Sequence, residues 1–334
     1  MSDGGTGDFA QLLAIAVSRR AGLVERLRAE GTDCWRVFHG ATEGLPGVAI
    51  DRFGALCMVQ LFRAASADCD VSALVEATAG HDVGEAIVVV DRRRGPAHVV
   101  VHGDHADDEY IAREGGMRCL VRARHAGQDP WLFLDLRAAR RALREIAPGR
   151  SVLNLFAYTC GAGVAAACAG AREVWNVDFS TNWLAIGARN AELNGVAACQ
   201  RFLAEAALAV MRQLAGIPVG RRGKVPHHAR IERRQFDVVV LDPPRLAHGS
   251  FGKIDLVGDY QSLFKPAWLS TAAGGTLIAT NNVASVERDS WLRALERCAE
   301  KAGRPLRDVQ VLAPDADFPS PDGRSPLKVA LCQA

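Results

Sequence analysis

The stretch SVLNLFAYTCGAGVAAACAGAREVWNVDFS, residues 151–180, decides the fold class. It opens with the apolar run SVLNLFAY, which is typical of a buried strand, and it closes with a second strand, EVWNVDFS. Between them lie a turn that contains glycine and a helical segment rich in alanine. A strand, a helix and a strand in immediate succession form a crossover that places the two strands parallel in one sheet. The stretch therefore predicts an α/β fold.

The same alternation of strands and helices continues to the C-terminus. Five more strands are predicted at 200–204, 236–244, 276–282, 307–313 and 327–333, and helices at 132–147, 182–195, 205–216, 260–275 and 290–303 lie before or between most of them. Helices that connect parallel strands cover both faces of a sheet. The last two strands are joined by a loop, which favours an antiparallel edge. We predict a Rossmann-like sheet of seven strands, mostly parallel, with one antiparallel edge strand.

The N-terminal third has a different pattern. Apolar residues recur at helical spacing between positions 9 and 30, and short strand-like runs separated by Gly, Pro and Asp follow. We predict a disordered tail at 1–8, a small α+β domain at 9–117 and an α/β domain at 118–334. A basic segment at 216–234 interrupts the alternation and is predicted to be an insertion.

Composition narrows the class of protein. Hydrophobic residues make up 49% and charged residues 23% of the chain, as in ordinary soluble proteins, and the net charge of +2 does not by itself indicate a nucleic-acid binder. The nine cysteines form no CxxC pair and show no zinc spacing, so we expect reduced thiols, no metal site and a cytoplasmic location. The N-terminal stretch has no signal-peptide pattern, and no apolar run is long enough to cross a bilayer, which argues against a membrane partner.

The fourth predicted strand of the α/β domain ends abruptly. The run FDVVV (236–240) leads into LDPPR (241–245), and proline neither donates to a sheet ladder nor leaves φ free. The backbone after the strand is therefore rigid and keeps free carbonyl groups. Asp242 lies at this end, where α/β sheets bind their ligands. A plain strand terminus with a helix-capping acid is the alternative interpretation.

Two features of the first crossover indicate a nucleotide-containing cofactor. Gly161 and Gly163 would let a ligand approach the backbone at a helix N-terminus. Asp178 ends the second strand, where a carboxylate can accept hydrogen bonds from both ribose hydroxyls of NAD or S-adenosylmethionine. The rigid Asp-Pro-Pro favours the methyl donor, since Asp242 and the carbonyl group of Pro243 could hold a planar base beside it. An NAD-dependent oxidoreductase is the alternative.

The motifs as a set resemble a known family. The run FLDLR … LNLFAYTCGAGVAAACAGA … NVDFSTNWL … RNAELNG … FDVVVLDPP is similar to bacterial class I S-adenosylmethionine-dependent methyltransferases that modify 23S ribosomal RNA. CWRVFHGATEGLPGVAIDRFG (34–54) resembles the small domain that precedes their catalytic domain. The resemblance covers about Leu23 to the C-terminus, and it implies the class I methyltransferase fold with S-adenosylmethionine as cofactor. It includes no counterpart of the PUA or THUMP module that this family usually carries at its N-terminus.

The resemblance also assigns a cofactor site. The methionine end would lie along Phe133, Asp135 and Arg137. The loop beneath the cofactor and its strand would supply Asn154, Phe156, Tyr158, Thr159, Cys160 and Gly161. Asp178 would hold the ribose, Phe179 and Ser180 would lie beside the adenine, and Asp242 is also assigned to the site. Glu205 would replace the Asp that often binds the adenine amino group, because Ala206 stands at that place.

Two branches of the family methylate different atoms. Carbon-5 of cytosine is a poor nucleophile, so the cytosine branch first adds a Cys thiolate to the ring. Here the ends of the fourth and fifth strands, DPPR and TNN (280–282), contain no Cys. TNN is similar to the branch that methylates N7 of guanine, whose lone pair needs positioning and no thiolate. The resemblance therefore implies guanine, N7 first and N2 second, with Asp242, Pro243, Pro244 and Asn281 as catalytic residues.

The expected partner is RNA, either 23S ribosomal RNA or a large-subunit precursor. Arg245 and Asn282 would contact it, together with Arg221, Arg222 and Lys224 of the basic segment. Two other functions stay open: a cytosine-C5 enzyme with an atypical nucleophile such as Cys160, and a catalytically decayed protein that only binds RNA or the ribosome. The sequence also leaves a homodimer open.

Overall fold

The computed structural model describes residues 6–65, 69–81, 83–95, 100–105, 107–123, 130–219, 228–249 and 252–334. The chain forms two compact units, Met1–Arg137 with Pro314–Arg324 and Ala138–Ala313 with Ser325–Ala334. The boundary thus lies at Arg137 rather than at 117, and a segment from near the C-terminus joins the first unit. The predicted tail lies mostly outside the described residues, although the first helix begins at Thr6.

The first unit is an α+β structure built on a five-stranded sheet in the order β1-β2-β3-β4-β5. Its elements are α1 (Thr6–Ala29), β1 (Cys34–His39), β2 (Val48–Phe53), β3 (Leu56–Leu61), α2 (Val71–Ala79), β4 (Ala86–Asp91), β5 (Val100–His102), the hairpin β6 (Tyr110–Glu114) and β7 (Met117–Val121), and the short η2 (Leu134–Leu136). β3 and β4 are parallel and α2 connects them, whereas the other neighbours are antiparallel. Leu13 and Leu27 of α1 are buried against Phe38 and Ile50 of the sheet, as the helical spacing predicts.

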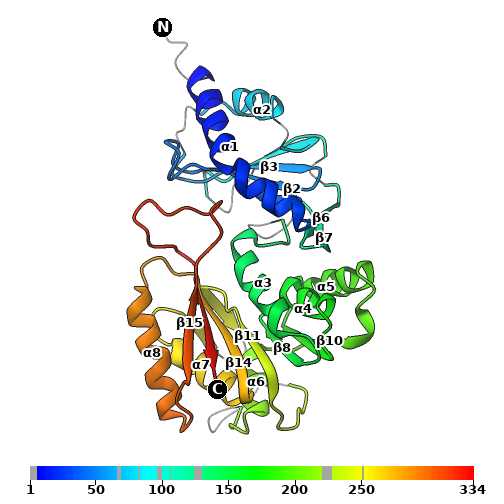
Figure 1. The fold of residues 1–334 in the computed structure, drawn as a ribbon, viewed down its shortest axis with the longest axis vertical. Coiled ribbons are helices and arrows are strands. Elements are labelled where there is room, and N and C mark those ends of the chain that lie inside the picture. Colours follow the sequence, from blue (N-terminus) through cyan, green and yellow to red (C-terminus); the bar gives the residue numbers. More distant parts are fainter. Residues whose placement is uncertain are drawn as a thin grey trace. The chain divides into compact units, whose positions relative to one another are not determined.

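The second unit contains a seven-stranded sheet in the order β10-β9-β8-β11-β14-β16-β15 (Figure 1). Its elements are α3 (Arg137–Ile146), β8 (Ser151–Leu155), α4 (Gly161–Cys168), β9 (Glu173–Asp178), α5 (Thr181–Leu193), η3 (Ala197–Cys199), β10 (Gln200–Ala204), α6 (Ala207–Leu214), β11 (Phe236–Leu241), the hairpin β12 (Leu246–Gly249) and β13 (Gly252–Asp255), α7 (Tyr260–Leu269), β14 (Thr271–Asn281), α8 (Arg288–Lys301), β15 (Asp308–Leu312) and β16 (Lys328–Gln333). β16 is antiparallel to both of its neighbours, and the other strands are parallel. The predicted Rossmann-like sheet with an antiparallel pair at one edge is confirmed, and its antiparallel strand lies one place in from the edge strand β15.

Helices pack on the sheet through apolar side chains. α6, α7 and α8 share one core with the strands, in which Val210, Trp268 and Leu295 meet Phe236 and Leu277. α4 and α5 pack together against β8, β9 and β10. The β12–β13 hairpin directly after the double proline was not predicted, because strands of four residues carry too little periodicity. None of the helices in the described ranges combines the length and the apolar composition needed to cross a bilayer.

Strand register brings four chain segments to the same rim of this sheet. Leu155 at the end of β8 pairs with Val177 of β9 on one side and with Leu241 of β11 on the other. Leu241 in turn pairs with Ala279 of β14. The residues that follow these positions, among them Asp178, Asp242 and Thr280, therefore gather at the carboxyl ends of the parallel strands. This is the rim where open α/β sheets bind ligands.

Candidate active site

The loop that follows β8 has an uncommon backbone. Phe156, Tyr158 and Cys160 have φ of 58°, 50° and 62°, in the left-handed region that residues with a side chain rarely adopt. Each such residue costs on the order of 1–3 kcal/mol and persists only where its surroundings hold it. The amide groups of Ala157 and Tyr158 donate to β9, the first to the carbonyl oxygen of Val177 at 3.0 Å and the second to Oδ2 of Asp178 at 2.9 Å. The loop is thus shaped around the end of β9, as expected for a ligand-binding loop.

Asp178 organises this part of the rim. Its Oδ1 accepts the amide hydrogen of Ser180 at 2.9 Å while Oδ2 accepts that of Tyr158. Burial raises the pKa of the Asp178 carboxyl above its usual value, and the backbone hydrogen bonds offset part of that rise. A carboxylate offers about four acceptor positions, so capacity remains for the two hydroxyls of a ribose. The neighbouring Phe179 has 72% of its surface exposed and offers a flat face beside them.

Gly163 packs against the protein rather than against open space. A Cβ atom on Gly163 would lie 1.9 Å from Oδ1 of Asn176. Asn176 belongs to a buried row of amides, in which Asn154 donates to Asn176 at 3.0 Å and Asn176 donates to Gln200 at 2.8 Å. The missing side chain of Gly163 therefore lets α4 approach β9 closely. The predicted close approach of a ligand to the backbone stays a prediction for Gly161, the first residue of α4.

The corner after β11 joins two strands. The hydroxyl group of Thr280 in β14 donates to Oδ1 of Asp242, and the hydroxyl group of Tyr260 donates to the carbonyl oxygen of Thr280 at 2.7 Å. Pro243 is buried, whereas Pro244 and Arg245 are exposed. Asp242 is half-buried at this corner, so its carboxylate can be reached from the surface. The two prolines that follow make its backbone rigid.

Comparison with known proteins decides the family. Residues 72–333 match the family described as S-adenosylmethionine-dependent methyltransferases. The chain belongs to this family. "Ribosomal RNA large subunit methyltransferase I" of Aeromonas hydrophila is 29% identical over 93% of this chain and 76% of its own length. "Ribosomal RNA large subunit methyltransferase" of Deinococcus radiodurans is 28% identical over 90% of this chain and 72% of its own length.

Solved structures show the same fold. A Streptococcus mutans protein assigned as a SAM-dependent methyltransferase superposes with a TM-score of 0.80 at 21% identity, covering 100% of this chain and 83% of its own. A solved methyltransferase complexed with S-adenosylhomocysteine, SMU.776, gives a TM-score of 0.79 with the same coverage and identity. Membership of the family matched by residues 72–333 means that the protein uses S-adenosylmethionine, which supplies an electrophilic methyl group on a sulfonium centre.

Residues of the second unit have the chemical groups that the cofactor requires. Asp178 is placed to accept from a ribose diol, and Phe179 is exposed beside it. Ser180 caps α5, because its Oγ accepts the amide hydrogen of Trp183 at 3.4 Å. Thr159 and Asn154 are buried. The carbonyl oxygen of Thr159 accepts a hydrogen bond from the side chain of Asn190, which stabilises the loop. The side chain of Asn154 in β8 donates to Asn176 in β9. Their predicted contacts with the cofactor stay predictions.

Glu205 has a structural partner in the methyltransferase. Its amide group donates to the carbonyl oxygen of Asp178 at 3.0 Å, which places it next to the acid that the sequence assigns to the ribose. Its Oε1 accepts the amide hydrogen of Ala229 at 2.9 Å. The carboxylate thus holds the segment that re-enters the described part of the chain after residue 227. Arg221, Arg222 and Lys224, which the sequence assigned to RNA, lie outside the described residues.

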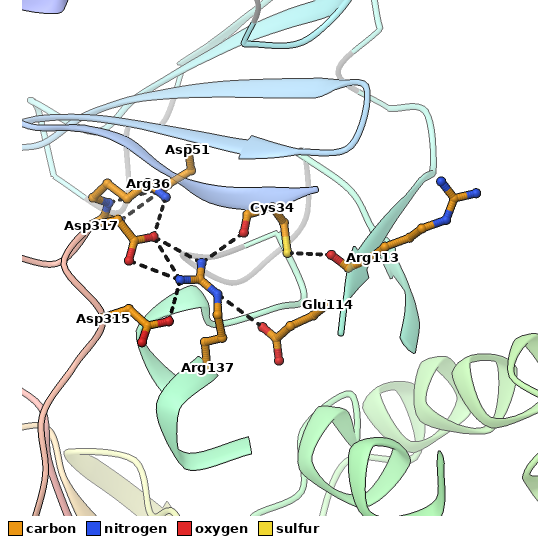
Figure 2. Close-up of polar contacts among 8 residues, drawn as sticks. All are labelled: Cys34, Arg36, Asp51, Arg113, Glu114, Arg137, Asp315 and Asp317. Atoms are coloured by element: carbon orange, nitrogen blue, oxygen red, sulfur yellow. Dashed lines mark hydrogen bonds and ion pairs between the residues drawn. The ribbon is translucent and has the colours of Figure 1, made fainter. Parts of the chain in front are cut away.

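Phe133, Asp135 and Arg137 belong to the first unit. Phe133 has 43% of its surface exposed, whereas Arg137 has only 2%. Figure 2 shows the Arg137 guanidinium among Asp315, Asp317, Glu114 and the carbonyl group of Cys34, and its bonds to Asp317 measure 3.1 Å. The guanidinium is therefore engaged within the first unit, and the structure gives no support to its predicted contact with the methionine end.

Asn281 and Asn282 differ in exposure. Asn281 is fully buried, and its Oδ1 accepts the amide hydrogen of Val283 at 3.0 Å. Its amide nitrogen donates to the carbonyl oxygen of Leu256 at 3.5 Å. One end of the Asn281 amide therefore stabilises the turn after β14 and the other ties it to Leu256, while Asn282 is exposed. The predicted catalytic role of Asn281 gains no support from this geometry.

The loop cysteine is not built as a nucleophile. Cys160 is completely buried, and its Sγ fills the space beside Gly187, where a Cβ would lie 2.3 Å from it. Burial raises the pKa of the Cys160 thiol well above its usual value, and the charge of Asp178 raises it further. The thiol therefore stays protonated at neutral pH, and only the thiolate attacks a pyrimidine ring.

Asp178→Ala is expected to weaken cofactor binding. Losing hydrogen bonds to a charged acceptor costs about 1.5–3 kcal/mol, which corresponds to roughly a 10- to 100-fold higher dissociation constant. Calorimetric titration with S-adenosylhomocysteine measures the change. Glu205→Gln is the matched control and should bind normally if its carboxylate serves only Ala229. An unchanged affinity of Asp178→Ala would contradict the assigned role.

Proposed function

We propose that this methyltransferase modifies a guanine of large-subunit ribosomal RNA, at N7 or N2, by direct transfer from S-adenosylmethionine. The names of the Aeromonas and Deinococcus relatives support this class of RNA. The observation that supports a guanine acceptor is the chemistry of the rim, where Asp242 and Thr280 lie at the strand ends and the thiol of the loop residue Cys160 is buried with a raised pKa. Neither guanine nitrogen requires covalent activation.

The work of the protein is then alignment and hydrogen bonding. Asp242 and the carbonyl group of Pro243 accept hydrogen bonds from the N–H groups on the Watson–Crick edge of guanine, which discriminates against bases that lack them. The prolines hold these acceptors in place, so little reorganisation is needed during transfer. Arg245 and Asn282 are exposed beside this corner and are suited to contact the nucleotide or its phosphate.

Nucleoside mapping tests the proposal. Ribosomal RNA from a strain that lacks the gene should miss one methylguanosine in the large-subunit RNA, and expression of the wild-type chain should restore it. Purified protein with S-adenosylmethionine should add the same methyl group to that RNA in vitro. Loss of a 5-methylcytidine would contradict the guanine acceptor, and an unchanged modification profile together with normal cofactor binding would favour a protein that binds RNA without methylating it.

Cys160→Ser is expected to keep most of the turnover. Serine is slightly smaller than cysteine, so it fits the buried position, and it keeps a polar hydrogen on the side that faces the carbonyl oxygen of Tyr158. Steady-state methyl transfer to ribosomal RNA measures the rate, and thermal unfolding checks that the buried substitution leaves the fold intact. Complete loss of transfer in a folded Cys160→Ser protein would favour a covalent mechanism on cytosine instead.

A further inference from the structure

A chain of side chains lies behind Asp242. Thr280, the penultimate residue of β14, donates its hydroxyl hydrogen to Oδ1 of Asp242. Tyr260, the first residue of α7, donates to the carbonyl oxygen of Thr280 at 2.7 Å. The ring of Trp291 in α8 meets the ring of Tyr260 edge to face, with centroids 5.7 Å apart and an interplanar angle of 89°. Two helices therefore support one strand end, which in turn holds the carboxylate.

This support is shielded from water. Thr280, Tyr260 and Trp291 are 1%, 7% and 3% exposed. Hydrogen bonds in such surroundings are stronger than in water, and a buried hydroxyl that loses its acceptor is costly. Burial also raises the pKa of the Tyr260 hydroxyl well above its usual value, so that group remains a donor across the physiological range. In this arrangement the Tyr260 hydroxyl donates to β14 and the Thr280 hydroxyl donates to Asp242.

The double proline does not fix the side chain of Asp242. Proline fixes the backbone φ after Asp242, but the torsion of an Asp carboxylate about its last bond is broad. A half-buried carboxylate would therefore sample several orientations unless a neighbour held one of its oxygens. The Thr280 hydroxyl is placed to do this from the adjacent strand.

We propose that Thr280 is a positioning residue for methyl transfer, which holds the Asp242 carboxylate in one orientation toward the acceptor base, and that Tyr260 fixes the Thr280 backbone from behind. This inference rests on the proposed function of Asp242. Thr280 acts through Asp242 and does not touch the base itself. Its effect is on the rate of transfer, because a misplaced acceptor raises the barrier more than it weakens cofactor binding.

Three variants test the inference with ribosomal RNA from the deletion strain as methyl acceptor. Thr280→Val keeps the shape and removes the hydroxyl, and it should lower kcat by about 10²-fold, the order expected for a misplaced group. Thr280→Ser keeps the hydroxyl and should restore most of the rate. Tyr260→Phe should give an intermediate loss. The dissociation constant for S-adenosylhomocysteine should stay within about twofold of wild type in all three, since Asp178 and its loop are unchanged.

The outcomes separate this inference from the proposed function. Normal kcat in Thr280→Val, or a rate in Thr280→Ser as low as in Thr280→Val, overturns the positioning role. Asp242→Ala is measured in parallel: if it is inactive while Thr280→Val is normal, only the positioning role fails. If Asp242→Ala is fully active, the assigned role of Asp242 fails. Should Thr280→Val not fold, the Tyr260→Phe rate decides, and a wild-type value there overturns the inference.

Discussion

Asp242→Ala is expected to abolish methyl transfer while S-adenosylmethionine still binds. Removing one pre-organised hydrogen-bonding group from an active site typically lowers kcat by about 10²–10³-fold. Asp242 lies at the carboxyl end of β11, and the hydroxyl of Thr280 and the following prolines hold it. Single-turnover transfer to ribosomal RNA measures the rate, and calorimetry with S-adenosylhomocysteine measures the affinity.

The matched control is Asp237→Asn on the same strand. Asp237 lies near the opposite end of β11, where its Oδ2 accepts hydrogen bonds from the amide and hydroxyl groups of Ser151 at 2.8 Å. Its replacement should leave the transfer rate near that of the wild type. A loss of cofactor affinity with normal turnover at saturation in Asp242→Ala would make Asp242 a cofactor contact instead of an acceptor-binding residue.

Arg137→Met is expected to destabilise the first unit by about 3–5 kcal/mol, the usual cost of removing one partner from a buried ion pair. The side chains of Arg137 and Asp317 are 2% and 0% exposed. Burial alone would lower the pKa of the Arg137 guanidinium, but the charge of Asp317, its hydrogen bonds and the charge of Glu114 outweigh burial and raise that pKa. Without the arginine, the buried Asp317 carboxylate would keep the hydrogen bond from the Arg36 amide but would lose its guanidinium partner (Figure 2).

Urea unfolding read by hydrogen exchange in peptides from β1 and β6 locates the loss in the first unit. Adding Asp317→Asn to Arg137→Met should recover part of the stability, because one uncompensated charge disappears. Arg113→Met is the surface control. Its side chain is 62% exposed and lies 3.8 Å from Asp33, so its removal should change little. Lost affinity for S-adenosylhomocysteine with unchanged stability in Arg137→Met would instead restore the predicted contact with the methionine end.

Local patterns in the sequence were sufficient for the architecture. Strand and helix periodicities are set by neighbouring residues, so the alternation after residue 150 predicted the parallel sheet and the antiparallel pair at its edge. The positions of Asp178 and Asp242 at strand ends followed from the same patterns, because parallel strands place their carboxyl ends on one rim. The short hairpin after the double proline was missed, since four-residue strands give almost no periodic signal.

The partners of individual side chains depended on tertiary structure. Arg137 looks like a cofactor ligand in its local motif, yet its carboxylate partner Asp317 lies 180 positions away in the chain. Asn281 stands at a strand end, where the sequence suggests a functional amide, but the turn after β14 buries it. Gly163 lies in a glycine turn, and only the packing of α4 on β9 shows that Asn176 occupies the space beside it.

The sequence by itself determined the fold class, the rim of the sheet and the acids that lie there, because these follow from periodicity and from the rigidity of proline. Only the tertiary structure decided which polar groups are already engaged and which remain at the surface. Thr280 and Asp242 are 38 residues apart and meet through the register of β11 and β14, and hydrogen bonds of this kind are fixed by packing that no local pattern encodes.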